Sequence, residues 1–143
     1  MRNEHKWEWY FNSEPARVRP IVAEILGHLD KAVPHKTNEE RGDLRLIFSE
    51  LLYNAVLHGN ASDKNKMVHI RLTVTGRVVR ARITDEGSGH NYIKTLSDLE
   101  RENDVFREKG RGLQLVKALA DNISFERGGR CVSFEKNLGR DNE

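Results

Sequence analysis

Apolar residues recur along this chain with two different periods, and the changes of period mark the predicted elements. Residues 7–11 alternate between aromatic and polar side chains, which predicts a short strand. A first helix, capped by Asn12 or Ser13, then runs to about Leu29. Pro20 lacks a backbone donor, so it must lie in the first turn of that helix or kink it.

A capping box marks the start of a second helix. Thr37 and Glu40 have the spacing at which each side chain satisfies the other residue's backbone N–H. The helical pattern continues from Asn38 to His58, and Gly59 is a natural C-terminal stop. This helix is therefore predicted over about 20 residues.

The rest of the chain predicts two hairpins and one more helix. Residues 67–76 and 77–85 alternate with period two around a Thr-Gly turn, residues 113–120 have helical spacing, and residues 122–136 form a closing hairpin around Gly128. This order predicts an α+β fold, a two-layer sandwich with about three helices packed on one face of a mixed, mostly antiparallel sheet.

Size and charge narrow the class of protein. The 143 residues suit a single domain over 1–143, and 24 basic residues nearly balance 22 acidic ones. The net charge is therefore too small to favour direct binding to nucleic acid or to a membrane. The single cysteine, Cys131, lies in an apolar alternation and is expected to pack in the core. Without an apolar leader or spanning segment, we expect a cytoplasmic protein.

Two polar residues interrupt the second helix one turn apart. Glu50 and Asn54 have i,i+4 spacing, which places them about 40° apart on the helix flank. An Asn oxygen suits Mg²⁺, and a Glu can act as a general base or orient a hydroxyl. His58, one turn further on, can reach a phosphate or simply end the helix. The alternative is a solvated helix surface, where such pairs are common.

A carboxylate and two glycines follow the predicted strand that ends near residue 84. Asp85 at a strand end can accept a hydrogen bond from an exocyclic amine, which distinguishes adenine from guanine. Gly87 and Gly89 allow the backbone to turn sharply and approach a flat ring. The alternative is an ordinary turn, since Asp and Gly are standard turn residues.

A second glycine pair opens the third predicted helix. Gly110 and Gly112 leave helix N-terminal amides accessible to phosphates, Arg111 can add a charged contact, and Leu113 begins the apolar face. The spacing matches neither the P-loop nor the dinucleotide-binding fingerprint. The alternative is a flexible loop that merely ends at a helix.

The three motifs together resemble a known superfamily. A helix with ExxxNA, a strand ending in DxGxG and a helix with GxGL, in this order, resemble the Bergerat-type (GHKL, histidine-kinase-like) ATPases. Within that superfamily the chain is most similar to the anti-sigma factor serine/threonine kinases, in its length, in SExxxNAxxHG over residues 49–59 and in GRGL over residues 110–113. The likeness extends from Trp9 to Lys136.

The resemblance implies a role for each polar residue. Asn54 would bind Mg²⁺, Glu50 would be the catalytic base, and Asp85 would bind the adenine amino group, with Gly87 and Gly89 shaping the base pocket. The cofactors implied are ATP and Mg²⁺.

The resemblance also implies phosphate contacts, a lid and partner proteins. Gly110 and Gly112 would hold the phosphates, and the polar stretch 90–109 would be the ATP lid. The predicted nucleotide-binding residues also include His58, Arg111 and Leu113. Kinases of this type phosphorylate a serine or threonine of an anti-anti-sigma (STAS-type) antagonist and sequester a sigma factor, usually as homodimers. The expected function is therefore a protein kinase in a partner switch.

Three alternatives remain at the sequence level. A detached histidine-kinase catalytic domain would need a phosphoaccepting His on a dimerisation helix, and His5, His28 and His35 lie outside any such helical hairpin. A second alternative is an ATP-binding module that sequesters a protein without kinase turnover. A third, an ATPase that drives large conformational change, would need further domains to couple to.

Overall fold

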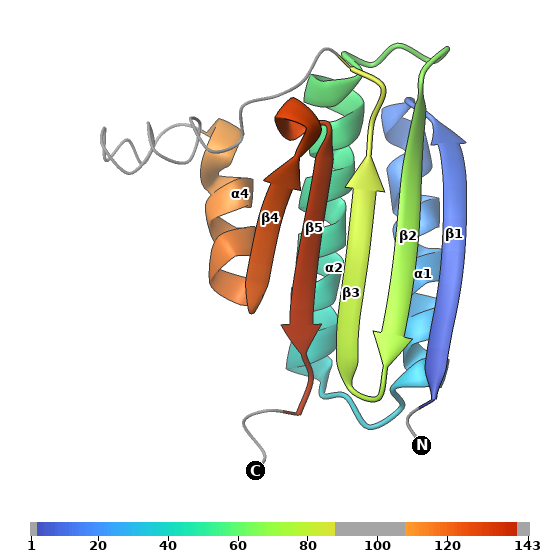
Figure 1. Cartoon of the computed structure of the whole chain (residues 1–143), viewed down its shortest axis with the longest axis vertical. Coiled ribbons are helices and arrows are strands. Elements are labelled where there is room, and N and C mark those ends of the chain that lie inside the picture. Colours follow the sequence, from blue (N-terminus) through green and yellow to red (C-terminus); the bar gives the residue numbers. More distant parts are fainter. Residues whose placement is uncertain (1–2, 88–107, 140–143) are drawn as a thin grey trace.

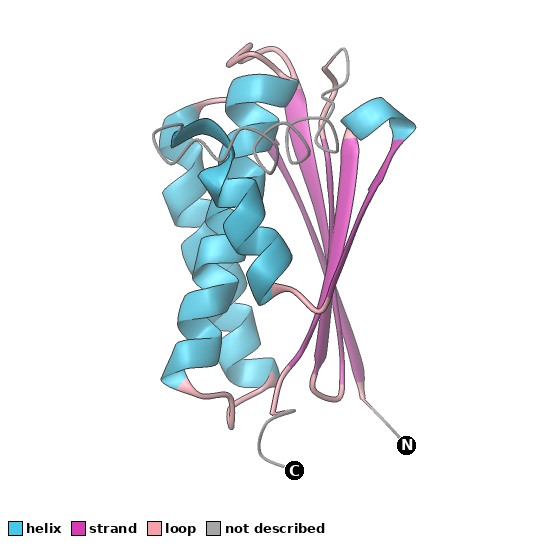
Figure 2. Ribbon diagram, turned by 90° about the vertical axis from the view of Figure 1, so that its left-hand side faces the viewer, coloured by secondary structure: helices cyan, strands magenta, loops and turns pink. Residues whose placement is uncertain are grey.

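The computed structural model describes residues 3–87 and 108–139. These residues form two layers, with the helices on one side and a single sheet on the other (Figures 1 and 2). The regular elements are β1 (Glu4–Asn12), α1 (Val18–Ala32), α2 (Asn38–Asn54), β2 (Met67–Thr75), β3 (Val78–Thr84), α4 (Glu108–Leu119), β4 (Asn122–Glu126) and β5 (Cys131–Asn137). Short 3₁₀ turns at Pro15–Arg17 and Arg127–Gly129 and a π-helical turn at Ala55–Gly59 complete this part of the chain.

The five strands have the order β1-β2-β3-β5-β4, and all four pairings are antiparallel. β3, α4 and β4 make a crossover in which the two strands run the same way, but β5 returns between them. The predicted two-layer α+β class is confirmed. The described strands contain no parallel pair, because β5 occupies the position beside β3 that a parallel β4 would need.

The capping box predicted for the second helix is confirmed, but the cap predicted for the first helix is wrong. Glu40 N–H donates to Thr37 Oγ1 (3.0 Å), and Thr37 N–H donates to Glu40 Oε1 (2.8 Å), so both halves of the capping box form.

Arg17 is the N-cap of α1 without a side-chain hydrogen bond, and the Pro15–Arg17 turn separates α1 from Asn12 and Ser13. Asn12 Nδ2 donates to the Lys64 carbonyl instead, and Ser13 Oγ accepts a hydrogen bond from Asn60 Nδ2. Pro20 is the third residue of α1, where its missing N–H costs no helical hydrogen bond. No helix in the described residues is long and apolar enough to cross a bilayer.

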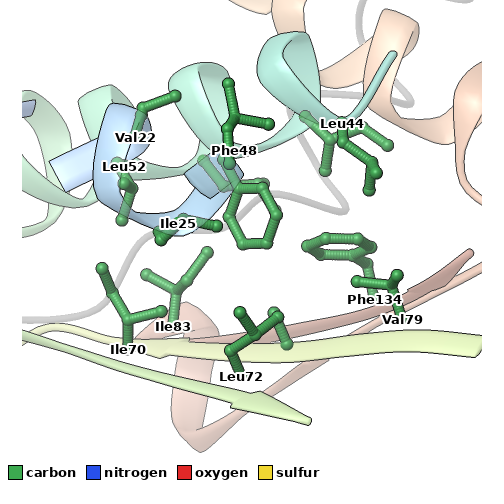
Figure 3. Packing of buried hydrophobic residues seen from close by; sticks show 14 of the residues in the cluster. Val22, Ile25, Leu44, Phe48, Leu52, Ile70, Leu72, Val79, Ile83 and Phe134 are labelled. Atoms are coloured by element: carbon green, nitrogen blue, oxygen red, sulfur yellow. The ribbon is translucent and has the colours of Figure 1, made fainter. Parts of the chain in front are cut away.

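The core lies between the helical layer and one face of the sheet (Figure 3). The ring centroids of Phe48 on α2 and Phe134 on β5 are 5.1 Å apart, and the rings meet edge to face at 73°. Buried aliphatic side chains from α1, α2, β2 and β3 surround this pair, among them Val22, Ile25, Leu52, Ile70, Leu72 and Ile83. Cys131 is fully buried as predicted, but it lies outside this hydrophobic cluster, and its Sγ accepts hydrogen bonds from Arg82 Nε (2.8 Å) and Thr84 Oγ1 (3.5 Å).

An ion-pair cluster joins α1 to α2 at Asp30. Arg41 Nε lies 2.9 Å and Lys36 Nζ lies 2.5 Å from Asp30 Oδ1, and the Lys36 side chain is almost completely buried. The hydrogen bond from Arg41, assisted by Lys36 and opposed by partial burial, lowers the pKa of Asp30. A carboxyl whose folded pKa is lowered stabilises the protein above its unfolded pKa and loses this effect as pH falls through the folded pKa.

We therefore expect Asp30→Asn to lower the free energy of unfolding at neutral pH by about 1 kcal/mol or less, because the group is partly exposed to solvent. Below the folded pKa of Asp30 the variant and the wild type should be equally stable. Chemical denaturation across a pH series measures this difference. The control is Glu24→Gln on α1, an exposed residue with no ion pair among the described residues; an equal loss in both variants would contradict the prediction.

Candidate nucleotide-binding site

The ends of three elements meet at one end of the molecule, the upper end in Figure 1. α2 ends there, β3 ends there, and α4 begins there. The three motifs singled out in the sequence lie on these three elements, so the fold brings together segments far apart in the chain.

Asp85 follows β3 directly and is almost completely buried, with 5% of its surface exposed. Its N–H donates to the Arg130 carbonyl, and its Oδ1 accepts the Gly87 N–H, both at 2.9 Å. Burial raises the pKa of this carboxyl, although the Gly87 hydrogen bond and the positive charges of Arg130 and Lys66 oppose the shift. Among the described residues no donor hydrogen-bonds to Oδ2, and this oxygen is not one of the fully buried atoms without a partner, so it can accept from a donor such as an amino group.

Two glycines enclose this carboxylate. A Cβ on Gly59 would overlap Asp85 Oδ2, and a Cβ on Gly87 would overlap the carbonyl oxygen of Gly59. Neither glycine has a positive φ, so each is required for close approach rather than for a left-handed turn. Gly59 was predicted only as the end of a helix, yet it forms one wall of the Asp85 environment.

The predicted second helix continues to Gly59, but its last turn is a π-helix rather than an α-helix. Asn60 N–H donates to the Ala55 carbonyl over five residues (2.9 Å), and Ser62 N–H donates to the Val56 carbonyl (2.8 Å). Such π-helical turns are rare and frequently lie at functional sites. Here the wider turn places Gly59 against Asp85.

A second close approach joins α2 to α4. A Cβ on Gly112 would overlap the Glu50 carboxylate, so the glycine leaves room for Glu50 at the start of α4. Glu50 is half-buried, and no ion pair holds it among the described residues. Leu113, beside Gly112, has its side chain in the hydrophobic core, which leaves only its backbone for a ligand.

The other residues predicted on α2 lie along the same helix. Asn54 is the last residue of α2, one turn beyond Glu50, and His58 lies in the π-helical turn; both side chains are half-buried. An amide oxygen such as that of Asn54 is a ligand that suits Mg²⁺, and the Glu50 carboxylate lies one turn away.

The glycine-rich helix start differs slightly from the prediction. α4 begins at Glu108, two residues before Gly110, which is consistent with the helix propensity of Glu and Lys. Gly110 and Arg111 therefore lie within its first turn, where backbone amides lack helical partners. Gly89 lies outside the described part of the chain. So does the lid predicted over 90–109, except for its last two residues.

Sequence reasoning missed the buried side chain of Asn60, which is hydrogen-bonded to the residue after Asp85. Asn60 is fully buried, its Nδ2 donates to Ser13 Oγ (2.6 Å) and to the Met67 carbonyl (3.0 Å), and its Oδ1 accepts the Glu86 N–H (2.8 Å). The available signal was the tripeptide His-Gly-Asn, in which an Asn directly after the helix-ending Gly resembles a plain turn residue.

Comparison with known proteins places this arrangement in a family. The family described as the histidine kinase-like ATPase domain matches residues 11–136, which include all three motifs. The chain belongs to this histidine kinase-like ATPase family.

Within that family the chain is similar, over most of its length, to proteins named anti-sigma F factor. It is 32% identical to the one from Geobacillus stearothermophilus, over 88% of this chain and 84% of the relative. Identity is 25% to the one from Geobacillus thermodenitrificans, over 98% and 96% of the two chains. With the one from Clostridium acetobutylicum it shares 28% identity, over 86% of this chain and 85% of the relative.

Proposed function

We propose that this protein is an ATP-dependent serine/threonine kinase of the anti-sigma factor type. It transfers the γ-phosphoryl group of ATP to an anti-anti-sigma (STAS-type) antagonist and, as a homodimer, holds a sigma factor until the unphosphorylated antagonist displaces it. The observation that carries the proposal is the Asp85 carboxylate, enclosed by Gly59 and Gly87, with one oxygen to which no described residue donates a hydrogen bond. Similarity to anti-sigma F factors along nearly the whole chain supports the choice of partner class.

In this proposal Asp85 recognises the base. Its Oδ2 accepts a hydrogen bond from the 6-amino group of adenine, and the close approach of Gly59 to the carboxylate and of Gly87 to Gly59 holds that oxygen in place. A 6-oxo purine presents an acceptor at the same position, so the carboxylate repels it. Gly89 and the lid over 90–109 complete the base pocket in this proposal.

The residues of α2 and α4 act on the phosphates. The free amides in the first turn of α4, including that of Gly110, bind the phosphate oxygens, and the missing side chain of Gly112 keeps the approach open beside Glu50. Arg111 adds a positive charge and His58 a further contact. Asn54 provides an oxygen ligand to Mg²⁺, which neutralises phosphate charge when bound.

Glu50 acts as the general base at the reacting atoms. The proton of the substrate hydroxyl passes to its carboxylate while the hydroxyl oxygen bonds to the γ-phosphorus. The bond from that phosphorus to the β,γ-bridging oxygen breaks, and ADP leaves with the electron pair. Phosphoryl transfer depends mainly on positioning and charge stabilisation, so a few well-placed groups are sufficient.

The first experiment is calorimetric titration of the full chain with ATP and Mg²⁺, followed by transfer of labelled phosphate to STAS-type proteins from the same genome. Saturable binding with transfer to a serine or threonine supports the kinase. Binding with no transfer to any of them favours the alternative, a protein-sequestering module without turnover. Absence of ATP binding overturns both.

Asp85→Asn separates nucleotide binding from stability. We expect ATP binding to weaken about 10-fold to 100-fold, the range for a lost hydrogen bond to a charged group. Burial raises the pKa of Asp85, so its ionised form costs stability once pH rises above the unfolded pKa. A neutral carboxamide removes this cost and still accepts the Gly87 N–H, so the variant should be more stable than the wild type at neutral pH.

Titration calorimetry and chemical denaturation of the same preparations check the two effects of Asp85→Asn together. Asp63→Asn is the matched control, because Asp63 also accepts a backbone N–H, from Asn65, but lies away from the glycine walls. Tight ATP binding by Asp85→Asn would rule out the proposed base contact.

A further inference from the structure

Asn60 is the fully buried asparagine that follows Gly59, and all three of its side-chain hydrogen bonds cross between different segments of the chain. Its Nδ2 donates to Ser13 Oγ beyond the end of β1 and to the Met67 carbonyl at the start of β2. Its Oδ1 accepts the N–H of Glu86, the residue after Asp85. One carboxamide therefore joins three segments at the end of the sheet.

Hydrogen bonds to Asn60 and to Met67 hold the turn that carries Asp85. Glu86 is fixed through its N–H on Asn60 Oδ1 and through its carboxylate, which accepts the Met67 N–H at 2.7 Å. Asn60 also fixes the position of Gly59, the residue before it, because the Asn60 N–H donates to the Ala55 carbonyl and closes the π-helical turn. Ser13, itself fully buried, is held by its N–H on the Lys66 carbonyl (3.0 Å).

We propose that Asn60 is a positioning residue for Asp85, which fixes the distance between that carboxylate and the Gly59 wall and thereby sets the preference for a 6-aminopurine. This inference rests on the proposed function, in which Asp85 binds the base. The role requires a side chain that donates twice and accepts once within a buried space, which a carboxamide does and a carboxylate or an aliphatic chain does not. An unsatisfied Glu86 N–H or Ser13 hydroxyl in that space would shift the turn toward another partner.

The test compares two nucleotides that differ only at the base. Purine riboside triphosphate lacks the 6-amino group of ATP, so the ratio of the two dissociation constants reports the contact to Asp85 alone. We expect the wild type to prefer ATP by about 10-fold to 100-fold. In Asn60→Ala this ratio should fall to within about threefold of unity, and ATP should bind more weakly while the analogue is nearly unaffected.

A merely structural role gives a different result. If Asn60 supports only the fold, Asn60→Ala weakens both nucleotides equally and the ratio stays at its wild-type value, which overturns the inference and leaves the proposed function intact. A wild type that binds ATP no better than the analogue rules out the Asp85 base contact and this inference with it, whereas a wild type that binds neither nucleotide overturns the proposed function.

Two further variants keep the test decisive. Ser13→Ala removes only one acceptor of the Asn60 amide, so it should fold even where Asn60→Ala does not, and it should reduce the ratio part of the way. If Asn60→Ala does not fold, Ser13→Ala alone decides the test. A folded Ser13→Ala that keeps the wild-type ratio of dissociation constants then counts against the inference. Asn65→Ala is the matched control, an exposed asparagine in the same loop, and it should keep the wild-type ratio.

Discussion

Glu50→Gln should lower the rate of phosphoryl transfer to the protein substrate by about 10²-fold to 10⁴-fold, the usual contribution of a general base. Gln has nearly the same shape as Glu, so it still fits against Gly112, where only a glycine leaves room for the carboxylate. It has no basic oxygen to take the hydroxyl proton. Binding of ATP and of partner proteins should therefore remain close to that of the wild type.

Single-turnover transfer of labelled phosphate, with ATP binding measured on the same samples, checks this prediction. Glu24→Gln, exposed on α1, is the matched control and should transfer phosphate at the wild-type rate. A wild-type rate in Glu50→Gln would remove Glu50 from the chemistry and leave it as a surface residue of α2. A parallel loss of transfer and ATP binding would instead indicate a role in holding the nucleotide.

The elements were predictable from sequence wherever the determining interactions are local. The capping box at Thr37 and Glu40 needs only residues three apart, and the hairpin between β2 and β3 needs only a turn between two alternating runs. Sheet order was not predictable in this way. The insertion of β5 between β3 and β4 depends on strand pairings formed over long separations, which no local pattern encodes.

The site shows the same division between local and long-range information. Glu50 and Asn54 could be paired from helical spacing alone, and Asp85 could be identified because it ends an alternating run. The roles of Gly59 and Asn60 depend on the turn after β3, which is distant in sequence, and on a π-helical turn that has no simple sequence signature. A glycine that ends a helix and a glycine that must touch a carboxylate look identical until the fold brings the carboxylate to it.

Whether a close contact makes a glycine necessary can be tested with two glycines of the same chain, Gly87 and Gly27. Gly87→Ala should lower the free energy of unfolding by about 1–3 kcal/mol, the range for overpacking, because the new Cβ would overlap the carbonyl oxygen of Gly59. Backbone cannot rotate away as a flexible side chain can, so the turn bearing Asp85 must move. ATP binding should then weaken by at least about tenfold, comparable with loss of the Asp85 contact itself.

Gly27→Ala is the matched substitution, and it should have the opposite sign. Gly27 lies inside α1, and a Cβ there would meet no atom within 4 Å. Alanine in a helix interior is more favourable than glycine by about 0.5–1 kcal/mol, so this variant should be stabilised and should bind ATP normally. Denaturation and titration of both variants measure the contrast. If Gly87→Ala binds ATP as tightly as Gly27→Ala does, close contact between the Gly59 and Gly87 backbones is not what holds Asp85 in its binding position.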